Sequence, residues 1–278
     1  MEEVTGLAFD EKRYYKRQLS FPMIGEEGQN KLRSSKILVV GAGGLGSPLL
    51  MYLVGLGIGE IVVFDFDKIE YENLHRQILF NVDEIGEYKA LIAIKKLQKY
   101  NPWVKISGYT EKIDEKNIEE ILSKRFFAFD LIIDCSDNLA TRFLIHDNAY
   151  KFHINLLSVA IDHLSGSLLF FNFVDSADSK TGEEGCLRCL WPNSQNSQIL
   201  ALDENKNFRG ILNIVPGMIA TMAVMEIAKF LLKWEGSLKQ AENFLIDLTN
   251  FETNRVRWNK KKDCSLCGSL NSQDKKQK

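Results

Sequence analysis

The stretch that decides the fold is residues 36–46, KILVVGAGGLG. Its first five residues are mostly apolar and β-branched and stop at a glycine, which favours a strand buried on both faces. The pattern G-x-G-x-x-G follows directly, at Gly41, Gly43 and Gly46. Apolar residues then recur at helical spacing over residues 45–56, so the chain passes from strand to helix across glycines. This order is typical of an α/β fold that binds a nucleotide.

An acidic residue supports the same interpretation. Glycines leave the backbone open to a phosphate group, and the start of the next helix offers unpaired N–H groups and the positive end of a dipole. Asp65 comes 19 residues after Gly46, at the end of a second apolar run. There its carboxylate can accept hydrogen bonds from ribose hydroxyls. A tight turn made only for packing is the alternative. The residues of the predicted nucleotide site are Gly41, Gly43, Gly44, Gly46 and Asp65.

Strand and helix patterns alternate along much of the chain. This alternation predicts an α/β protein: a doubly wound, Rossmann-like, mostly parallel sheet with helices on both faces. Late patterns predict two strands or a hairpin near the C-terminal end. The expected strands are residues 36–40, 61–64, 130–134, 168–171, 243–248 and 253–258, and the expected helices are 45–56, 90–97 and 216–234.

Composition excludes several classes of protein. The 278 residues carry 35 Lys+Arg and 37 Asp+Glu, and a net charge of −2 gives no bulk attraction to nucleic acid. The most apolar stretch, residues 219–232, contains Glu226 and Lys229 and is shorter than the ~20 residues that cross a bilayer. The acidic N-terminus does not have the pattern of a secretory signal. We therefore expect a cytoplasmic protein that binds neither nucleic acid nor a membrane.

Cations and amides follow Asp65 closely. Asn73, Arg76, Gln77 and Lys89 lie within 17 residues. Guanidinium and ammonium groups suit a triphosphate better than the smaller charge of a dinucleotide pyrophosphate. Solvated surface charges are the alternative. A nicotinamide-dependent oxidoreductase would use the same strand, glycines and acid, so that class stays open at this point.

Asp137 follows the apolar run 130–134, where doubly wound sheets bind their ligands. Beside a triphosphate, a carboxylate is expected to hold Mg²⁺, which binds one or two carboxylates together with phosphate oxygens. As part of the isolated pair Asp137-Asn138 it would instead be a turn former. The sequence thus predicts a magnesium ligand at this position.

Four of the five cysteines form two Cys-x-x-Cys pairs. Such pairs match tetrahedral coordination of Zn²⁺ by four thiolates, although 74 residues separate Cys189 from Cys264. Redox pairs and unrelated thiols are the alternatives. Four thiolates leave no open position on the metal, so a zinc ion here would be structural. The fifth cysteine, Cys135, lies in an apolar run and is expected in the core. The expected metal ligands are Cys186, Cys189, Cys264 and Cys267.

These motifs, taken together, resemble the ThiF/MoeB adenylyltransferases, relatives of ubiquitin-activating enzyme. The resemblance extends from about residue 13 to residue 268, in the family's order. In that family ATP activates the C-terminal glycine of a small ubiquitin-like sulfur-carrier protein ending in Gly-Gly, as an acyl-adenylate. The segments that carry the resemblance are RYYKRQ at 13–18, GAGGLG at 41–46, DFD at 65–67, NLHRQ at 73–77, GEYK at 86–89, DCSDN at 134–138 and both cysteine pairs.

The resemblance implies roles for individual residues. Asp65, in the same motif as Asp67, would bind the ribose, whereas Arg76 and Lys89 would bind the phosphates. Asn73 and Gln77 would add polar contacts, and Asp137 would hold Mg²⁺. Arg17 would reach the ATP of another subunit, which implies a homodimer. The residues to which a part in catalysis is assigned are Arg17, Arg76, Lys89 and Asp137.

The implied reaction needs no side-chain nucleophile, because the carrier's carboxylate itself attacks the α-phosphorus while pyrophosphate leaves. Several relatives also have a cysteine in the loop over the adenylate, but residues 190–263 contain none, and Asn213 stands near the usual position. We therefore expect adenylation, in a molybdopterin-type, thiamine-type or related sulfur pathway, without a covalent sulfur-transfer step. A homologue that activates a peptide or a tRNA-linked carboxylate, or a non-catalytic partner-binding homologue, is the alternative.

The predicted organisation is one adenylyltransferase domain over residues 1–278. Residues 1–35 are charged and are expected to form an irregular arm. The polar stretches 175–185 and 192–209 are expected to be surface insertions or a lid over the substrate. The predicted parts that follow the arm are a nucleotide-binding half at 36–174, a zinc half-site and crossover loop at 175–215, the C-terminal helix, strands and second zinc half-site at 216–268, and a disordered tail at 269–278.

Overall fold

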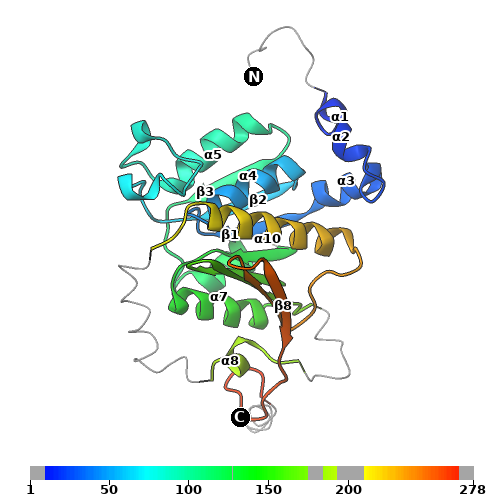
Figure 1. Cartoon of the computed structure of the whole chain (residues 1–278), viewed down its shortest axis with the longest axis vertical. Helices are drawn as coiled ribbons and strands as arrows, with labels where there is room; N and C mark the ends of the chain where they lie inside the picture. Colours follow the sequence, from blue (N-terminus) through cyan, green and yellow to red (C-terminus); the bar gives the residue numbers. More distant parts are fainter. Residues whose placement is uncertain (1–9, 127, 175–183, 193–209, 269–278) are drawn as a thin grey trace.

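The computed structural model describes residues 10–126, 128–174, 184–192 and 210–268. The strands in these residues form one eight-stranded sheet of order β3-β2-β1-β4-β5-β6-β7-β8 (Figure 1). The strands are β1 (Lys36–Val40), β2 (Glu60–Phe64), β3 (Lys105–Tyr109), β4 (Leu131–Asp134), β5 (Leu156–Asp162), β6 (Ser165–Phe171), β7 (Glu242–Asp247) and β8 (Glu252–Arg257).

The sheet has a parallel and an antiparallel half. β3, β2, β1, β4 and β5 pair in parallel, whereas β6, β7 and β8 continue the sheet in antiparallel pairs. β1 pairs with both β2 and β4, so the strand order changes direction at β1. In open α/β sheets this switch point, at the carboxyl ends of the strands, is where ligands bind. The predicted Rossmann-like fold is confirmed, and so is the late hairpin, as β7 and β8.

Helices cover both faces of the sheet (Figure 1). β1 shows why: Ile37 and Val39 pack in one core cluster, and Leu38 and Val40 pack in the other. Successive side chains of a strand point to opposite faces, so a continuous apolar run requires a helical layer on each side. One layer contains α3 (Gly25–Ser34), α4 (Gly46–Leu56), α5 (Lys89–Tyr100) and α10 (Ile214–Leu232), and the other contains α6 (Ile118–Glu120) and α7 (Leu139–Lys151).

Two strands, β3 and β5, have no counterpart among the predicted elements. β3 is an edge strand whose Gly108 leaves room for Ile94, because an added Cβ would stand 1.9 Å from Ile94 Cδ1. In β5, Ser158 interrupts the apolar run, yet its side chain is fully buried. Its hydroxyl donates to Asp134 Oδ2 at 2.8 Å, a partner 24 positions earlier in the chain. The apolar pattern is therefore broken where a distant carboxylate compensates for a polar core residue.

The expectation of an irregular N-terminal arm is wrong for residues 11–34. They form α1 (Glu11–Tyr14), α2 (Lys16–Leu19) and α3. Tyr15 is only 4% exposed, and its hydroxyl accepts a 2.6 Å hydrogen bond from Asn101 Nδ2. Gln18 Nε2 donates to the carbonyl of Leu56, at the C-terminal end of α4. Few side chains of this segment are buried, so its apolar periodicity is weak although it packs firmly onto the fold.

α10 is longer than the predicted apolar stretch 219–232 and has the length and composition of a membrane-spanning helix. Half of it is buried, however, among α3, α4, β5 and β6. Its buried Glu226 pairs with Lys229 at 2.6 Å and accepts the backbone N–H of Leu238. This packing is that of a core helix.

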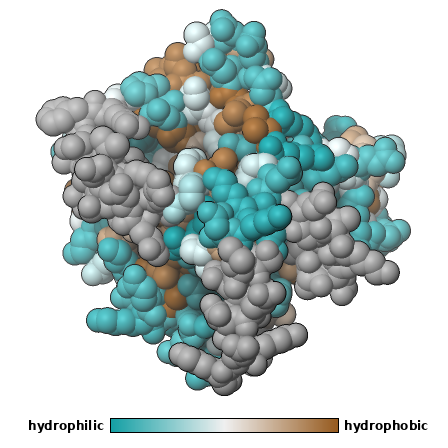
Figure 2. Space-filling view, turned by 90° about the horizontal axis from the view of Figure 1, so that it is seen from below, coloured by the Kyte–Doolittle hydropathy of each residue, from teal (hydrophilic) through white to brown (hydrophobic). Residues whose placement is uncertain are grey.

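Figure 2 shows the molecule from the end that carries α8 (Leu187–Leu190). In this view the surface of the described residues is mainly hydrophilic, with apolar side chains in separate groups. Most of the two long polar stretches, and the predicted disordered tail, lie outside the described residues.

Candidate nucleotide and metal sites

The glycine loop joins β1 to α4 at the switch point of the sheet. Its glycines meet different neighbours. A Cβ on Gly46 would lie 2.0 Å from the carbonyl oxygen of Gly41, so no side chain fits there. Gly41 itself has φ +96° and packs against the backbone of Cys135. Gly43, in contrast, would bring a Cβ only to 3.6 Å from Gln77 Nε2, so this side of the loop is open to a ligand.

Asp65 lies beside this loop at the end of β2. Its side chain is nearly buried, with Oδ2 accepting the Ala42 N–H at 2.7 Å and Oδ1 accepting the Asp67 N–H at 2.9 Å. Burial raises the pKa of Asp65, and the two backbone hydrogen bonds oppose this rise. The carboxylate is thus fixed at the loop, in the position expected for a ribose-binding acid.

The amides predicted to lie near the phosphates are brought to the loop by the segment between β2 and α5. Asn73 and Gln77 are buried, and Gln77 Nε2 donates to Asn73 Oδ1 at 3.0 Å. Gln77 Oε1 is the one buried side-chain oxygen or nitrogen of the described residues without a hydrogen-bond partner. Unpartnered buried polar atoms are costly and often mark a ligand position.

The two predicted cations lie in the same region. Lys89, the first residue of α5, is 5% exposed, and its Nζ is 3.0 Å from Asp67 Oδ2. The alternative of a solvated surface charge is therefore wrong for Lys89. Arg76 lies over the loop, 3.7 Å from where a Cβ of Gly44 would stand. Its Nη1 donates to the carbonyl of Glu72 and contacts His75 Nε2.

A buried polar network supports the loop that carries Asp137. Asp137 is exposed, but Asp134 beneath it is fully buried and accepts hydrogen bonds from Ser136 and Ser158. Arg142 of α7 lies 3.6 Å from Asp134 and donates to the carbonyl of Ser136 at 2.8 Å. No role for Arg142 or Ser158 is predicted from the sequence. A charged residue on the buried face of a helix was the available signal.

Arg17 and Asn213 occupy opposite ends of the nucleotide-binding layer. Arg17 is exposed on α2, which is attached near the C-terminal end of α4, whereas the glycine loop precedes the N-terminal end. An eleven-residue helix is about 16 Å long, so Arg17 is not brought to the loop of its own chain. Asn213 precedes α10, whose Pro216 lies 3.7 Å from where a Cβ of Gly44 would stand. The segment that begins α10 therefore borders the loop.

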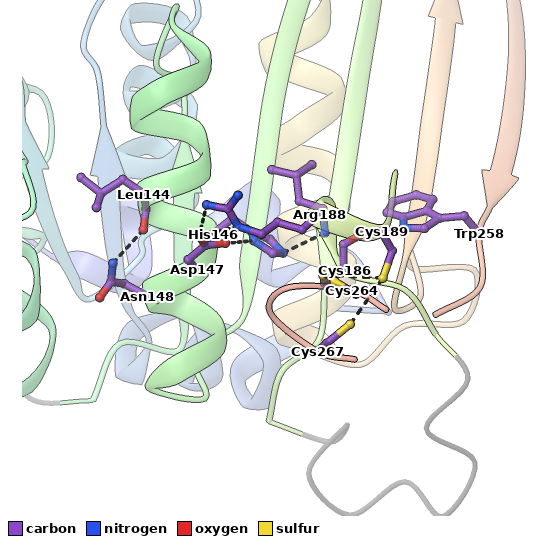
Figure 3. A network of polar contacts seen from close by, with 11 residues as sticks. Leu144, His146, Asp147, Asn148, Cys186, Arg188, Cys189, Trp258, Cys264 and Cys267 are labelled. Atoms are coloured by element: carbon purple, nitrogen blue, oxygen red, sulfur yellow. Dashed lines mark hydrogen bonds and ion pairs between the residues drawn. The ribbon is translucent and has the colours of Figure 1, made fainter. Parts of the chain in front are cut away.

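The four paired cysteines form a separate buried cluster (Figure 3). Their sulfur atoms all lie within 4.8 Å of one another, with Cys186–Cys264 at 3.5 Å and Cys189–Cys267 at 3.4 Å. A tetrahedral site with Zn–S bonds of about 2.3 Å has S–S edges of about 3.8 Å, whereas a disulfide needs about 2.05 Å. None of these four cysteines is in a disulfide. The donor set fits one tetrahedral metal ion.

Hydrogen bonds within this cluster set its charge when no metal is bound. The hydrogen bond from Cys186, with those from the other two cysteines, lowers the pKa of Cys267 to about 5. The hydrogen bond to Cys267, together with burial, raises the pKa of Cys186. Without a metal, deprotonation is thus favoured at Cys267 and disfavoured at Cys186. A divalent cation supplies the charge that four thiolates need.

Fold and site together define a Rossmann-like α/β protein with an open glycine loop at the switch point of its sheet and four clustered cysteines that fit one tetrahedral metal ion. The chain belongs to the ThiF family, whose sequence model matches residues 15–266. It is 34% identical over 255 residues to the sulfur carrier protein adenylyltransferase of Thermus thermophilus, and the match covers 91% of this chain and 90% of that protein. It is 38% identical to the adenylyltransferase and sulfurtransferase UBA4 of Meyerozyma guilliermondii over 82% of this chain but only 51% of that protein.

Solved structures share the fold. The structure of E. coli MccB with ATP has a TM-score of 0.75 and 20% sequence identity, and the match covers 93% of this chain and 75% of that chain. PaaA has a TM-score of 0.71 at 20% identity, over 92% of this chain and 85% of that one. Identities this low establish the common fold and no more.

Proposed function

We propose that the chain is an adenylyltransferase that uses ATP and Mg²⁺ to activate the C-terminal glycine of a small ubiquitin-like sulfur-carrier protein. The observation that carries the proposal is the gathering of Asp65, Gln77 and Lys89 around an open glycine loop, with Gln77 Oε1 unpartnered. The name of the Thermus thermophilus relative, a sulfur carrier protein adenylyltransferase, supports the proposal, because the match covers 91% of this chain and 90% of that protein.

In the proposed reaction, a carboxylate oxygen of the carrier forms a bond to the α-phosphorus of ATP. The bond between that phosphorus and the bridging oxygen breaks, and pyrophosphate leaves with the electron pair. Asp65 holds the ribose, Arg76 and Lys89 bind phosphate oxygens, and Asp137 binds Mg²⁺. Asn73 and Gln77 supply polar contacts, and Asp67 holds the ammonium of Lys89 at the site. The protein therefore positions two anionic reactants and neutralises charge.

A homodimer would complete this site. Arg17 stands at the far end of α4 from its own glycine loop, so we propose that it acts at the ATP of the partner. Apolar side chains are exposed along the segment that surrounds the site, as expected of a surface that another chain covers. They are Phe66, Tyr71, Ile78, Val82, Ile85, Tyr88 and Leu91.

The structural metal of the proposal is Zn²⁺, held by Cys186, Cys189, Cys264 and Cys267. With no open position it would tie the Cys264–Cys267 segment to α8 rather than join the reaction. Four reduced thiols also suit a cytoplasmic protein. We propose no sulfur-transfer step, because residues 190–263 contain no cysteine. The proposed setting is a molybdopterin-type, thiamine-type or related sulfur pathway.

The test is exchange of labelled pyrophosphate into ATP in the presence of single small proteins that end in Gly-Gly. We expect exchange with the cognate carrier and none after deletion of that carrier's terminal glycine. ATP consumption that needs no carrier would point instead to a homologue that activates a peptide or a tRNA-linked carboxylate. NADH binding without ATP binding would contradict the proposal altogether.

A further inference from the structure

The first cysteine pair is attached to α7 by a hydrogen bond from its own backbone. Leu187 lies between Cys186 and Cys189, and its N–H donates to His146 Nε2 at 3.0 Å (Figure 3). His146 is fully buried, with its ring edge-on to Phe171 and Phe173 at 4.8 and 5.5 Å. A side chain so enclosed has little freedom to move, so its nitrogen is a fixed acceptor for the loop.

A second connection joins the same turn to the same helix. Arg188 donates from Nε and Nη2 to Asp147 Oδ2 at 2.7 and 2.5 Å. The other oxygen of Asp147 is 3.0 Å from His146 Nδ1. Because His146 Nε2 accepts from Leu187, the ring proton resides on Nδ1 and is donated to Asp147. A closed ring of hydrogen bonds thus links α8 to α7, through Leu187 and Arg188 on one side and His146 and Asp147 on the other.

Residues that follow β8 also donate hydrogen bonds to the turn that contains Cys186 and Cys189. Trp258, just after β8, donates its indole N–H to the carbonyl of Cys186 at 2.9 Å. The backbone N–H of Lys261 donates to the sulfur of Cys189 at 3.3 Å. These contacts fix the backbone of Cys186 and the sulfur of Cys189 from the side opposite α7.

We infer that His146 and Asp147 are positioning residues for the metal: through Leu187 and Arg188 they hold Cys186 and Cys189 in ligating geometry and so set the affinity of the four-cysteine site. The inference rests on the proposed zinc site, and not on the proposed adenylation. Ligands that are already ordered lose less conformational freedom when the metal binds. Removing comparable supporting contacts in metalloproteins lowers metal affinity by about 10–100-fold.

The experiment measures the zinc affinity of the full-length protein by competition with a chromophoric chelator. His146→Leu keeps apolar volume but removes the acceptor for Leu187, and Asp147→Ala removes the acceptor for Arg188. We expect each variant to bind zinc about 10–100-fold more weakly. His146→Gln returns an acceptor close to the Nε2 position and is expected to restore the affinity to within about threefold of wild type.

An exposed pair in the same chain provides the matched control. His163 Nδ1 is 3.0 Å from Asp162 Oδ1, the same contact as in the buried pair, but both side chains are more than half exposed, with Asp162 at the end of β5 and His163 in the turn that follows. His163→Leu and Asp162→Ala are expected to leave the zinc affinity unchanged. A general effect of losing a histidine–aspartate contact would appear in these variants too.

Cobalt substitution separates positioning from ligation. At saturation, Co²⁺ in wild type and variants should give the same tetrahedral thiolate spectrum, because no ligand has been removed. The inference is overturned if folded His146→Leu and Asp147→Ala bind zinc as tightly as wild type, or if His146→Gln is as weak as His146→Leu. If His146→Leu does not fold, Asp147→Ala decides, since Asp147 is 23% exposed. Failure of wild type to bind zinc or cobalt would instead refute the metal site itself.

Discussion

Two glycines of one loop differ in why a side chain is excluded. At Gly46 the obstacle is the protein's own backbone, the Gly41 carbonyl. At Gly43 the protein leaves space, so the proposed obstacle is the phosphate that approaches the loop. Gly46 is therefore needed for folding, whereas Gly43 is proposed to be needed for ligand binding. Alanine substitutions at the two positions can distinguish these effects.

We expect Gly46→Ala to lower the free energy of unfolding by roughly 3 kcal/mol, since the backbone must shift to admit the methyl group. Gly43→Ala should unfold like wild type but bind ATP at least about 10-fold more weakly. Urea unfolding and ATP titration measure the two effects. Equal ATP affinity of wild type and Gly43→Ala would place the nucleotide away from this loop.

Arg76→Ala and Lys89→Ala should each slow pyrophosphate exchange by ~10²-fold or more, since each removes a charge worth ~3 kcal/mol to the transition state in a shielded site. Both variants should fold, because the Asp67 partner that Lys89 leaves behind is half exposed and can be solvated. Lys95→Ala on the exposed face of α5 is the control for Lys89. Near-normal exchange by a folded Arg76→Ala protein would refute the assignment of the phosphate site.

The residues proposed for the nucleotide site could be chosen from the sequence because most of them stand close together, next to a recognisable strand and helix. His146 and Ser158 could not. Each is hydrogen-bonded to a group that is distant in sequence, as in the contact between His146 and Leu187, 41 positions apart. When its hydrogen-bond partners are unknown, as they are from sequence alone, a buried histidine cannot be distinguished from an ordinary core residue.

At the scale of elements, ion pairs connect the first residues of three parallel strands. Glu60 of β2 lies 3.2 Å from Lys36 of β1 and 3.1 Å from Lys105 of β3. Burial raises the pKa of Glu60, but the hydrogen bonds from Lys105 and Lys36 outweigh it, so the pKa lies below its ordinary value. A lowered carboxyl pKa stabilises the fold above the pKa of the unfolded chain, about 4.3, and this contribution disappears as pH falls through the folded-state value.

We therefore expect Glu60→Gln to cost about 0.5–1 kcal/mol of unfolding free energy at pH 7 and progressively less as the pH falls below about 4.3. Urea unfolding of both proteins across this pH range measures the difference. Glu115→Gln, at an exposed position outside the sheet, should show no such dependence. A difference that does not shrink as the pH is lowered would mean that Glu60 acts through packing instead of charge.

The proposed metal site joins α8 to the segment that follows β8, two parts that are far apart in the sequence. The purified chain should hold about one Zn²⁺ per subunit, and Cys264→Ser should lose zinc and make the segment after β8 more sensitive to protease, because metal binding is coupled to folding. Elemental analysis and limited proteolysis measure both. Cys135→Ser, beside the glycine loop, should keep its zinc. Full zinc content in Cys264→Ser would exclude this residue as a ligand.

For the whole molecule, the proposed dimer predicts complementation between two inactive proteins. A heterodimer of Arg17→Ala and Asp137→Ala contains one site with both residues intact and one site with neither. Such mixed dimers should recover up to about half of the wild-type activity per site. The control replaces the second protein with one that carries both substitutions, so that neither site is complete. Verified mixed dimers without recovery would show that Arg17 does not act in trans.

The pairing of β6 with β7 has a consequence for the order of folding. Residues 165–170 meet residues 242–247, so about 70 positions must be synthesised before the sheet can extend beyond β6. All strands of the parallel half, by contrast, are synthesised before β6, so their pairs can form before β7 and β8 leave the ribosome. The cysteines of the second pair follow β8 still later. Metal loading would then be the last step of maturation, and bound zinc would mark chains whose C-terminal half has closed onto the first.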